Sequence, residues 1–238
     1  MKVALVFSGQ PRFVEQNGYL STKSTFLDKY DCDVYAHFWF SKGTLYETAP
    51  WSGLGALSIP DNAIDRFVQL YSPKGIHVEP PPREDEIVKR IYERSSNIRT
   101  PYNTFSVFTS HKRAFDLIPY PEDYDFIIRH RTDNIILRIP DLTTLSKDCI
   151  YRITQAEDRK VYNDSFAIFP GKYAKYFFHS VNILDDVYDK GCYFNNEELF
   201  SGILEYHNLI PICKTFTLAE FNFAFQRENN RIQICRQD

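Results

Sequence analysis

A strand-like segment in the middle of the sequence, YDFIIRHRTDN over residues 124–134, ends in two arginines and an aspartate. Ligands of open α/β sheets bind beyond the carboxyl ends of strands, so a ligand site is expected here. Asp133 can hold Mg²⁺ or Mn²⁺, which bind with one or two protein carboxylates and take further oxygens from a diphosphate. The planar guanidinium of Arg129 or Arg131 can pair with phosphate oxygens. The alternative is that Asp133 caps a turn with Asn134 while the arginines form ion pairs or lie at the surface.

A polar turn, Ser8-Gly9-Gln10-Pro11-Arg12, follows the first strand-like segment. Gly9 permits a positive φ or the close approach of a ligand to the backbone. Ser8 and Gln10 offer hydrogen bonds, and Arg12 offers a positive charge. The turn is neither a GxGxxG motif nor a P-loop, so the usual dinucleotide and ATP sites lose support. It is either a ligand-binding turn of another kind or an ordinary connection from strand to helix.

Acidic residues in the second half of the chain could supply a general base, the role that carboxylates often take in removing a proton from a hydroxyl. Asp164 lies just before a strand pattern, and Glu197 and Glu198 lie at the start of a helix pattern. Acidic residues in a first helical turn also favour the helix dipole, which suffices to explain one of the two glutamates. Adjacent helical side chains diverge by about 100°, so only one glutamate can face a cleft. Glu198 is slightly favoured, since Glu197 lies closer to the expected cap.

These residues lie at the ends of alternating strand and helix patterns. Strands are expected at 2–7, 33–40, 75–78, 124–129, 149–153, 165–169, 212–216 and 232–235. Helices are expected at 15–29, 62–71, 84–93, 102–118, 173–184, 197–206 and 218–227. Strand, helix and strand within the first 40 residues predict a parallel βαβ unit. The predicted fold class is α/β, with a mixed, mostly parallel sheet flanked by helices in a single domain.

Composition excludes several other classes of protein. The 238 residues are 43% hydrophobic and 25% charged, as in globular proteins, and the net charge of −3 argues against a nucleic-acid partner. An odd number of scattered cysteines without a CxxC motif indicates free thiols in a reducing compartment. No stretch approaches the roughly 20 apolar residues of a membrane span, and the N-terminal apolar run is too short for a signal peptide. The expected location is the cytoplasm.

Three segments, in this order, carry a resemblance to a known family: KVALVFSGQPRF at the N-terminus, DVYAHFWF at the second strand and YDFIIRHRTD at the later strand. They resemble a family of glycosyltransferases found in bacterial surface-polysaccharide clusters and in large DNA viruses. That family carries SGQPR near its N-terminus, His-x-Trp at the second strand and Arg-x-Asp at a strand end. The resemblance spans most of the chain and implies a GT-A fold. For a viral member it implies the host cytoplasm.

The resemblance also implies roles for individual residues. In GT-A enzymes a DxD element binds a divalent metal and the diphosphate of a nucleotide-sugar. Here the element is Arg131-Thr132-Asp133, in which the first aspartate is missing. A second metal ligand then comes from elsewhere, or the arginines replace part of the charge of the metal. By the same resemblance the nucleotide would contact Ser8, Gly9, Gln10 and Arg12, with His37 and Trp39 near its base or ribose.

The function implied is transfer of a sugar from a UDP- or GDP-sugar to a glycan or glycoprotein acceptor, assisted by Mn²⁺ or Mg²⁺. Residues 1–134 would form the nucleotide-sugar-binding half of the domain and residues 135–238 the acceptor-side half. One alternative is a nucleotidyltransferase that uses an NTP and a metal, although SGQPR supplies only one glycine and one basic residue. Another alternative is a non-catalytic nucleotide-sugar-binding protein. The single aspartate in the metal-binding element is compatible with this alternative.

Overall fold

A seven-stranded sheet forms the centre of the computed structural model, which describes residues 1–47, 56–82, 89, 101–156, 161–217, 220–226 and 232–234. Its strands follow the order β10-β8-β9-β6-β1-β2-β5. They are β1 Lys2–Gly9, β2 Asp31–Trp39, β5 Gly75–Glu79, β6 Phe126–His130, β8 Ile150–Ala156, β9 Val161–Phe169 and β10 Cys213–Phe216. Only β9 runs antiparallel to its neighbours in this sheet. The expected mixed, mostly parallel sheet is confirmed.

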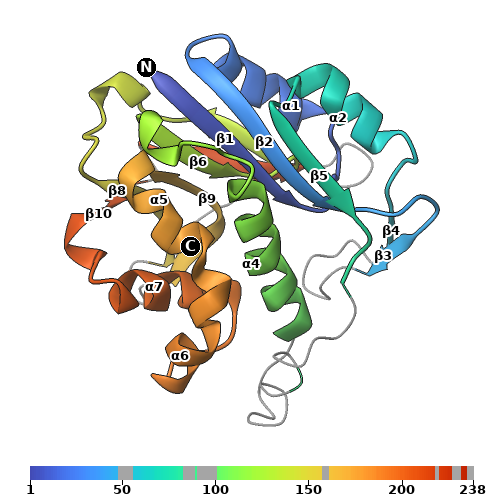
Figure 1. The fold of residues 1–238 in the computed structure, drawn as a ribbon. Helices are drawn as coiled ribbons and strands as arrows, with labels where there is room; N and C mark the ends of the chain where they lie inside the picture. The colour runs from blue at the N-terminus through green and yellow to red at the C-terminus, as the bar shows by residue number, and fades with distance from the viewer. Residues whose placement is uncertain are drawn as a thin grey trace.

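Helices cover both faces of this sheet, as Figure 1 shows, with α1 and α2 on one face and α4 to α7 on the other. Their bounds are α1 Asn17–Thr22, α2 Ala63–Tyr71, α4 Pro101–Phe115, α5 Gly171–Phe178, α6 Leu184–Asp189 and α7 Asn196–Tyr206. A π-helical turn, Lys23–Leu27, continues α1. Single 3₁₀ turns lie at Pro121–Asp123, Leu142–Thr144, Ser180–Ile183 and Ile210–Ile212.

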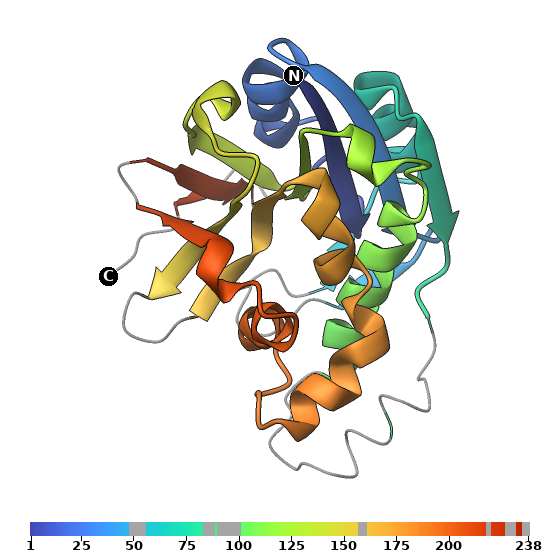
Figure 2. The ribbon, with the colours of Figure 1, turned by 60° about the vertical axis from the view of Figure 1, so that its left-hand side comes forward.

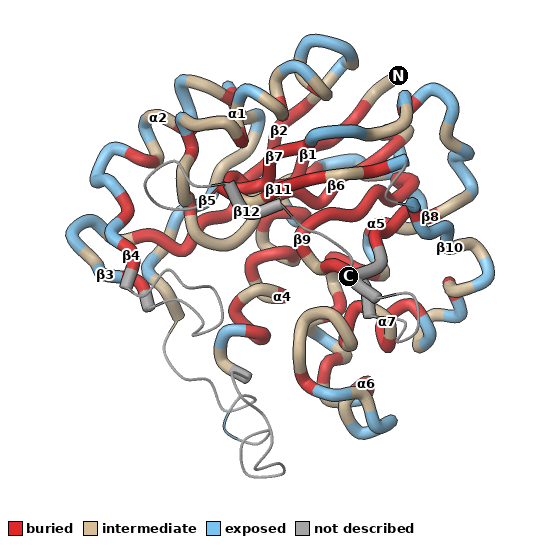
Figure 3. Tube along the Cα trace, turned by 180° about the vertical axis from the view of Figure 1, so that it is seen from behind, coloured by how far each residue is buried: buried red, intermediate tan, exposed pale blue. Residues whose placement is uncertain are grey.

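The first strand shows why the sheet is buried on both sides. Val3, Leu5 and Phe7 pack into the core under α1 and α2, whereas Ala4 and Val6 pack into the core under α4. Side chains alternate along a strand, so a strand covered on both faces needs a continuous apolar run, and KVALVF is such a run. Figure 3 shows this burial continuing along the neighbouring strands, with exposed residues on the outer helices and loops.

The pairing register brings the carboxyl ends of four parallel strands to one edge. Phe7 on β1 lies opposite His130 on β6, and Gly9 lies opposite Phe38 on β2. Trp39 on β2 lies in turn opposite Glu79 on β5. The turn after β1, the end of β2 and the segment after β6 therefore meet, as the sequence predicts.

A second, three-stranded sheet corrects part of the prediction. Its order is β12-β11-β7, with β7 Asn134–Arg138, β11 Asn222–Gln226 and β12 Ile232–Ile234. The helix expected over 218–227 is wrong, because 222–226 form a strand antiparallel to β7. The period-two repeat of Phe221, Phe223 and Phe225 fits a strand better than a helix. In Figure 2 the strands coloured yellow to red gather at the left, away from the blue strands.

The remaining expectations differ in detail. The expected helix at 173–184 is divided into α5, a 3₁₀ turn and the start of α6. The helix expected at 84–93 lies outside the described residues, apart from Lys89. The sequence did not predict β7 or a small hairpin of β3 Leu45–Glu47 and β4 Ala56–Ser58.

A close approach between α1 and the segment after β6 depends on Gly18. A Cβ atom there would lie 2.3 Å from the Thr132 carbonyl oxygen and 3.1 Å from the Asn134 carbonyl oxygen. Overpacking of this kind costs about 1–3 kcal/mol, so Gly18→Ala is expected to lower the free energy of unfolding in urea by that amount. Leu20→Ala, an exposed position on the same helix, is the control and should change stability by less than about 0.5 kcal/mol. Equal stability of the two variants would contradict this packing.

Candidate functional site

Polar side chains from the carboxyl ends of β1 and β2 meet one helix, α4. The backbone N–H of Gly9 donates a 2.8 Å hydrogen bond to Ser110 Oγ. His37 Nδ1 lies 2.8 Å from the same oxygen. The indole N–H of Trp39 donates to the carbonyl of Ser106 at 3.0 Å. Helix α4 thus connects the turn after β1 to the end of β2, and the two predicted segments lie side by side.

Arg129 is a buried cation on the same face of the sheet, 2% exposed near the end of β6. Its Nε donates a 2.7 Å hydrogen bond to His111 Nε2 on α4. Its Nη2 lies 3.7 Å from an oxygen of Asp164. Its Nη1 is buried and finds no hydrogen-bond partner among the residues that the structure describes. Burial lowers the pKa of Arg129 to about 10, so the group remains charged at neutral pH.

His111 accepts a hydrogen bond from this cation. Burial, followed by the charges of Arg129 and Arg131, holds the pKa of His111 well below its ordinary value. The imidazole is therefore neutral, and the lone pair of Nε2 accepts the hydrogen bond from the Arg129 Nε–H group. His111 thus fixes the position of the guanidinium without neutralising its charge.

Two carboxylates face this arginine from different elements. Asp164, on β9, accepts a 3.0 Å hydrogen bond from the Asn196 side chain at the start of α7. Burial and then the charge of Asp164 raise the pKa of Glu197 to about 7, and Arg129 opposes the shift. Glu197 therefore exchanges a proton near neutral pH, which suits a general base or acid.

The two glutamates at the start of α7 have different surroundings. Asn195 caps the helix, and its side-chain oxygen accepts a 2.8 Å hydrogen bond from the backbone N–H of Glu198. The Glu198 carboxylate lies 3.4 Å from the amide nitrogen of the same asparagine. The sequence favoured Glu198 as the base. In the structure the charges of Asp164 and Arg129 act on the pKa of Glu197.

Asp133, the predicted metal ligand, is 2% exposed and paired with Arg131. Nε of Arg131 donates to one carboxylate oxygen at 2.8 Å, and Nη2 donates to the other at 2.7 Å. The backbone carbonyl of Asp133 accepts a 2.8 Å hydrogen bond from the N–H of Gln226 on β11. In this arrangement a guanidinium supplies the positive charge beside Asp133. A cation at this carboxylate would have to share it with Arg131.

The SGQPR turn is shaped by its glycine and by a local contact. Gly9 has a φ of +106°, in the region that favours glycine, and open space where a Cβ would stand. Nε of Arg12 donates to the side-chain oxygen of Gln10 at 2.7 Å. The Ser8 hydroxyl is buried and has no hydrogen-bond partner among the described residues. The turn therefore keeps an accessible backbone at Gly9 beside a buried hydroxyl.

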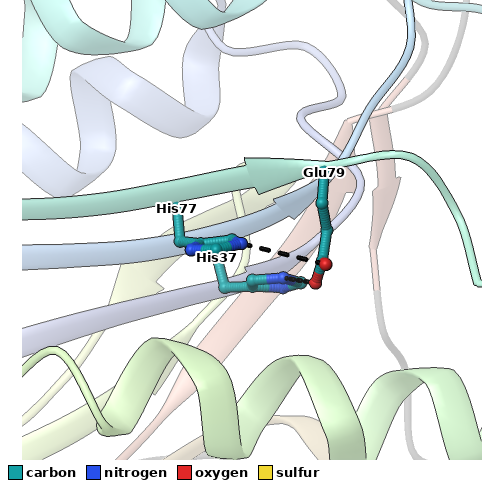
Figure 4. A group of neighbouring side chains, drawn as sticks. All are labelled: His37, His77 and Glu79. Carbon is teal, nitrogen blue, oxygen red and sulfur yellow. Dashed lines mark hydrogen bonds and ion pairs between the residues drawn. The ribbon is translucent and has the colours of Figure 1, made fainter.

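A third group, which the sequence analysis missed except for His37, lies at the ends of β2 and β5. His37 Nε2 lies 2.7 Å from Glu79 Oε1, and His77 Nε2 lies 3.8 Å from Glu79 Oε2 (Figure 4). Arg113 of α4 also pairs with Glu79. Glu79 directly follows the predicted strand 75–78 and precedes three prolines, so the rule of strand carboxyl ends could have indicated it. His111 carries no such signal, because only the packing of α4 places it beside Arg129.

The sequence matches no protein-family model and no curated protein. Among solved structures, the chain is similar to a protein from Desulfovibrio desulfuricans assigned provisionally as a nucleotide-diphospho-sugar transferase. The two are 12% identical, the match covers 90% of this chain and 79% of the other, and the TM-score is 0.37. A similarity at this level says nothing about activity.

Two further expectations concern the whole chain. Within the described ranges, no helix combines the length and apolar composition that crossing a membrane requires. The cysteines that the structure describes, Cys32, Cys149, Cys192 and Cys213, are free thiols as expected. Cys235 lies outside the described residues.

The raised pKa of Glu197 predicts a pH dependence of stability. The folded protein favours the neutral carboxyl, so this contribution to stability is complete below the ordinary pKa of 4.5 and is lost as the pH rises through about 7. Glu197→Gln is therefore expected to gain stability relative to the wild type as the pH rises from about 5 to about 8. Urea unfolding at several pH values measures this difference, with Glu198→Gln as the matched control. A constant difference between Glu197→Gln and the wild type across that range would contradict the assignment.

Proposed function

We propose that the protein transfers a sugar from a nucleotide-sugar donor to an acceptor hydroxyl. The observation that carries the proposal is a buried guanidinium, that of Arg129, which pairs with Asp164 and lies within electrostatic range of the Glu197 carboxyl. Arg129 and Glu197 come from β6 and α7, and they lie at the carboxyl edge of the sheet where α/β proteins bind ligands. Direct displacement at an anomeric carbon needs a cation for the departing diphosphate and a base for the attacking hydroxyl.

Arg129 is proposed to hold the diphosphate of the donor. Its Nη1 is buried and has no hydrogen-bond partner among the described residues, so one N–H group is available to a phosphate oxygen. A charged hydrogen-bond donor that is excluded from water stabilises developing negative charge more strongly than one in water. Because it is already in position, it needs no reorganisation as charge develops on the leaving group. Nearby, the backbone of the SGQPR turn at Gly9 can approach the nucleotide closely.

Glu197 is proposed to act as the general base. In the reaction the acceptor oxygen forms a bond to the anomeric carbon of the sugar while the bond from that carbon to the diphosphate oxygen breaks. The hydroxyl proton moves to the Glu197 carboxylate, and the nucleoside diphosphate departs with the bonding electrons. The charge of Asp164 raises the proton affinity of Glu197. Asp164 and Glu198 are the alternative bases.

Asp133 is proposed to bind Mn²⁺ or Mg²⁺ together with the diphosphate. Arg131 holds both oxygens of this carboxylate, so it would turn toward the phosphate when the cation arrives. A guanidinium and a hard cation both neutralise phosphate charge, so such an exchange keeps the local charge balanced. His37 and Trp39 are proposed to lie near the base or ribose.

The donor is proposed to be a UDP- or GDP-sugar, and the acceptor a glycan or glycoprotein. A screen of nucleotide-sugars for hydrolysis stimulated by Mn²⁺ would test this directly, and calorimetry would measure donor binding. Turnover of a nucleotide-sugar supports the proposal. Binding without turnover would favour a non-catalytic nucleotide-sugar-binding protein, and turnover of an NTP instead would favour a nucleotidyltransferase.

Substitution of Glu197 separates chemistry from binding. Glu197→Gln keeps the shape of the side chain but cannot accept the proton, so turnover should fall about 10²–10⁴-fold while donor affinity stays nearly normal. Glu198→Gln should behave like the wild type. The measurement is steady-state turnover beside calorimetric donor binding. Normal turnover of Glu197→Gln, with loss in Asp164→Asn or Glu198→Gln, would move the base to that residue.

Substitution of Asp133 tests the cation. Asp133→Asn removes the charge that would bind Mn²⁺ or Mg²⁺, so turnover and its stimulation by Mn²⁺ should both be lost. Circular dichroism should show that the fold persists. Turnover that remains unchanged and still rises with Mn²⁺ would place the cation elsewhere.

A further inference from the structure

We propose that His37, His77 and Glu79 form a binding site for a divalent transition-metal ion of the Zn²⁺ class. Among the described residues, their donor atoms all lie within 4.8 Å of one another. The two histidines lie opposite each other on the paired strands β2 and β5. Their rings are stacked, with centroids 5.5 Å apart and planes 22° from parallel. Figure 4 shows the Glu79 carboxylate turned toward both rings.

The donor set and its spacing suit such an ion. Two imidazole nitrogens and one carboxylate oxygen match the ligands of three-residue zinc sites, which leave a fourth position open. With bonds of about 2.0–2.1 Å, tetrahedral ligand atoms lie about 3.4 Å apart. The distances from Glu79 oxygens to the histidine nitrogens, 2.7 Å for His37 and 3.8 Å for His77, lie on either side of that value. Since all the donor atoms lie within 4.8 Å of one another, the side chains would have to close by at most about 1.4 Å to reach the tetrahedral spacing.

The second nitrogen of His37 is held as metal-binding histidines require. Nδ1 lies 2.8 Å from Ser110 Oγ, and that hydroxyl can donate in turn to the His37 carbonyl at 3.3 Å. When it does so, Nδ1 carries the proton, and a metal bound at Nε2 would replace the proton of the 2.7 Å hydrogen bond between Nε2 and Glu79. A partner of this kind fixes the tautomer and the ring plane of a metal ligand. Gly9 donates to the same hydroxyl, which fixes the serine as well.

The electrostatics around the group are compatible with a cation. The negative charge of the Glu79 carboxylate, 2.7 Å from His37 Nε2, favours a cation between these two groups. Arg113 is the group with which a metal must compete, because its guanidinium pairs with Glu79. That side chain is 42% exposed and also lies over the Trp39 ring, with its guanidinium carbon 5.1 Å from the centroid. The Arg113 guanidinium can therefore keep its contact with the Trp39 ring when a metal binds the Glu79 carboxylate.

The group is open on one side. The His77 side chain is 52% exposed and that of Glu79 is 25% exposed, whereas His37 is fully buried. A divalent ion on two neutral imidazoles and one carboxylate keeps a net positive charge. Its open position would suit water or an anionic oxygen. The metal site shares His37 with the proposed nucleotide-sugar site, where it lies near the base or ribose, but it includes neither Arg129, Asp133 nor Glu197. Metal binding can therefore be measured without glycosyl transfer.

Metal binding by the untagged full chain tests the proposal without an activity assay. After removal of metal with a chelator, Zn²⁺ should bind at one ion per chain in calorimetry, and Co²⁺ should give the visible absorption of a tetrahedral site. His77→Ala should weaken Zn²⁺ binding about 100-fold or more, at or above the 10–100-fold typical of losing an outer-shell partner. Glu79→Gln should weaken it similarly. His179→Ala, which removes an exposed histidine paired with Asp116, should bind as the wild type does.

The chosen variants avoid His37, whose burial makes it a risk to folding. A wild-type chain that binds no Zn²⁺ at stoichiometric levels would overturn the proposal. So would His77→Ala and Glu79→Gln variants that both bind Zn²⁺ as tightly as the wild type. Either result would leave the proposed transfer reaction intact, since turnover is measured separately with Asp133 and Glu197.

Discussion

The burial of one positive charge, that of Arg129 at the end of β6, constrains much of the rest of the structure. Taking a guanidinium out of water costs several kcal/mol unless hydrogen bonds and opposite charges offset the loss. Here the compensation comes from separate parts of the chain: His111 on α4 accepts from Nε, and Asp164 on β9 supplies negative charge. Glu197 on α7 adds a second carboxylate. The positions of α4, β9 and α7 around the carboxyl end of β6 are thus linked through a single side chain.

This constraint separates the sheet into two regions. Toward the amino ends of the strands, alternating apolar side chains pack against helices on both faces and supply stability. At the carboxyl ends, the face under α4 carries polar groups instead: Ser8 and the Gly9 N–H on β1, His37 on β2 and Arg129 on β6. Because α4 meets all three strands, Ser110 and His111 organise two neighbouring polar groups from adjacent positions on one helix. One group contains the carboxylates Asp164 and Glu197, and the other contains the histidines and Glu79.

The sequence predicted the main strands and the edge at which the site lies, because both follow from local patterns. Continuous apolar runs predicted β1, β2 and β6. The strand-end rule placed Arg129 at the ligand edge, and the family resemblance placed SGQPR and His37 there. Features that depend on long-range packing were missed. The sequence could not show that Arg131 would turn back onto Asp133, or that burial and the charge of Asp164 would raise the pKa of Glu197. The pairing of His77 with His37 depends on strand register, and β11 was mistaken for a helix although its aromatic residues alternate.

The central claim is that the buried guanidinium of Arg129 receives the diphosphate of a nucleotide-sugar. A crystal structure of the protein with a bound UDP- or GDP-sugar tests it most directly. The account predicts a phosphate oxygen within about 2.7–3.2 Å of Arg129 Nη1, with Asp164 and Glu197 on the side of the sugar. A nucleotide bound with its diphosphate away from the carboxyl end of β6, and with Arg129 still contacting only His111 and Asp164, would contradict it.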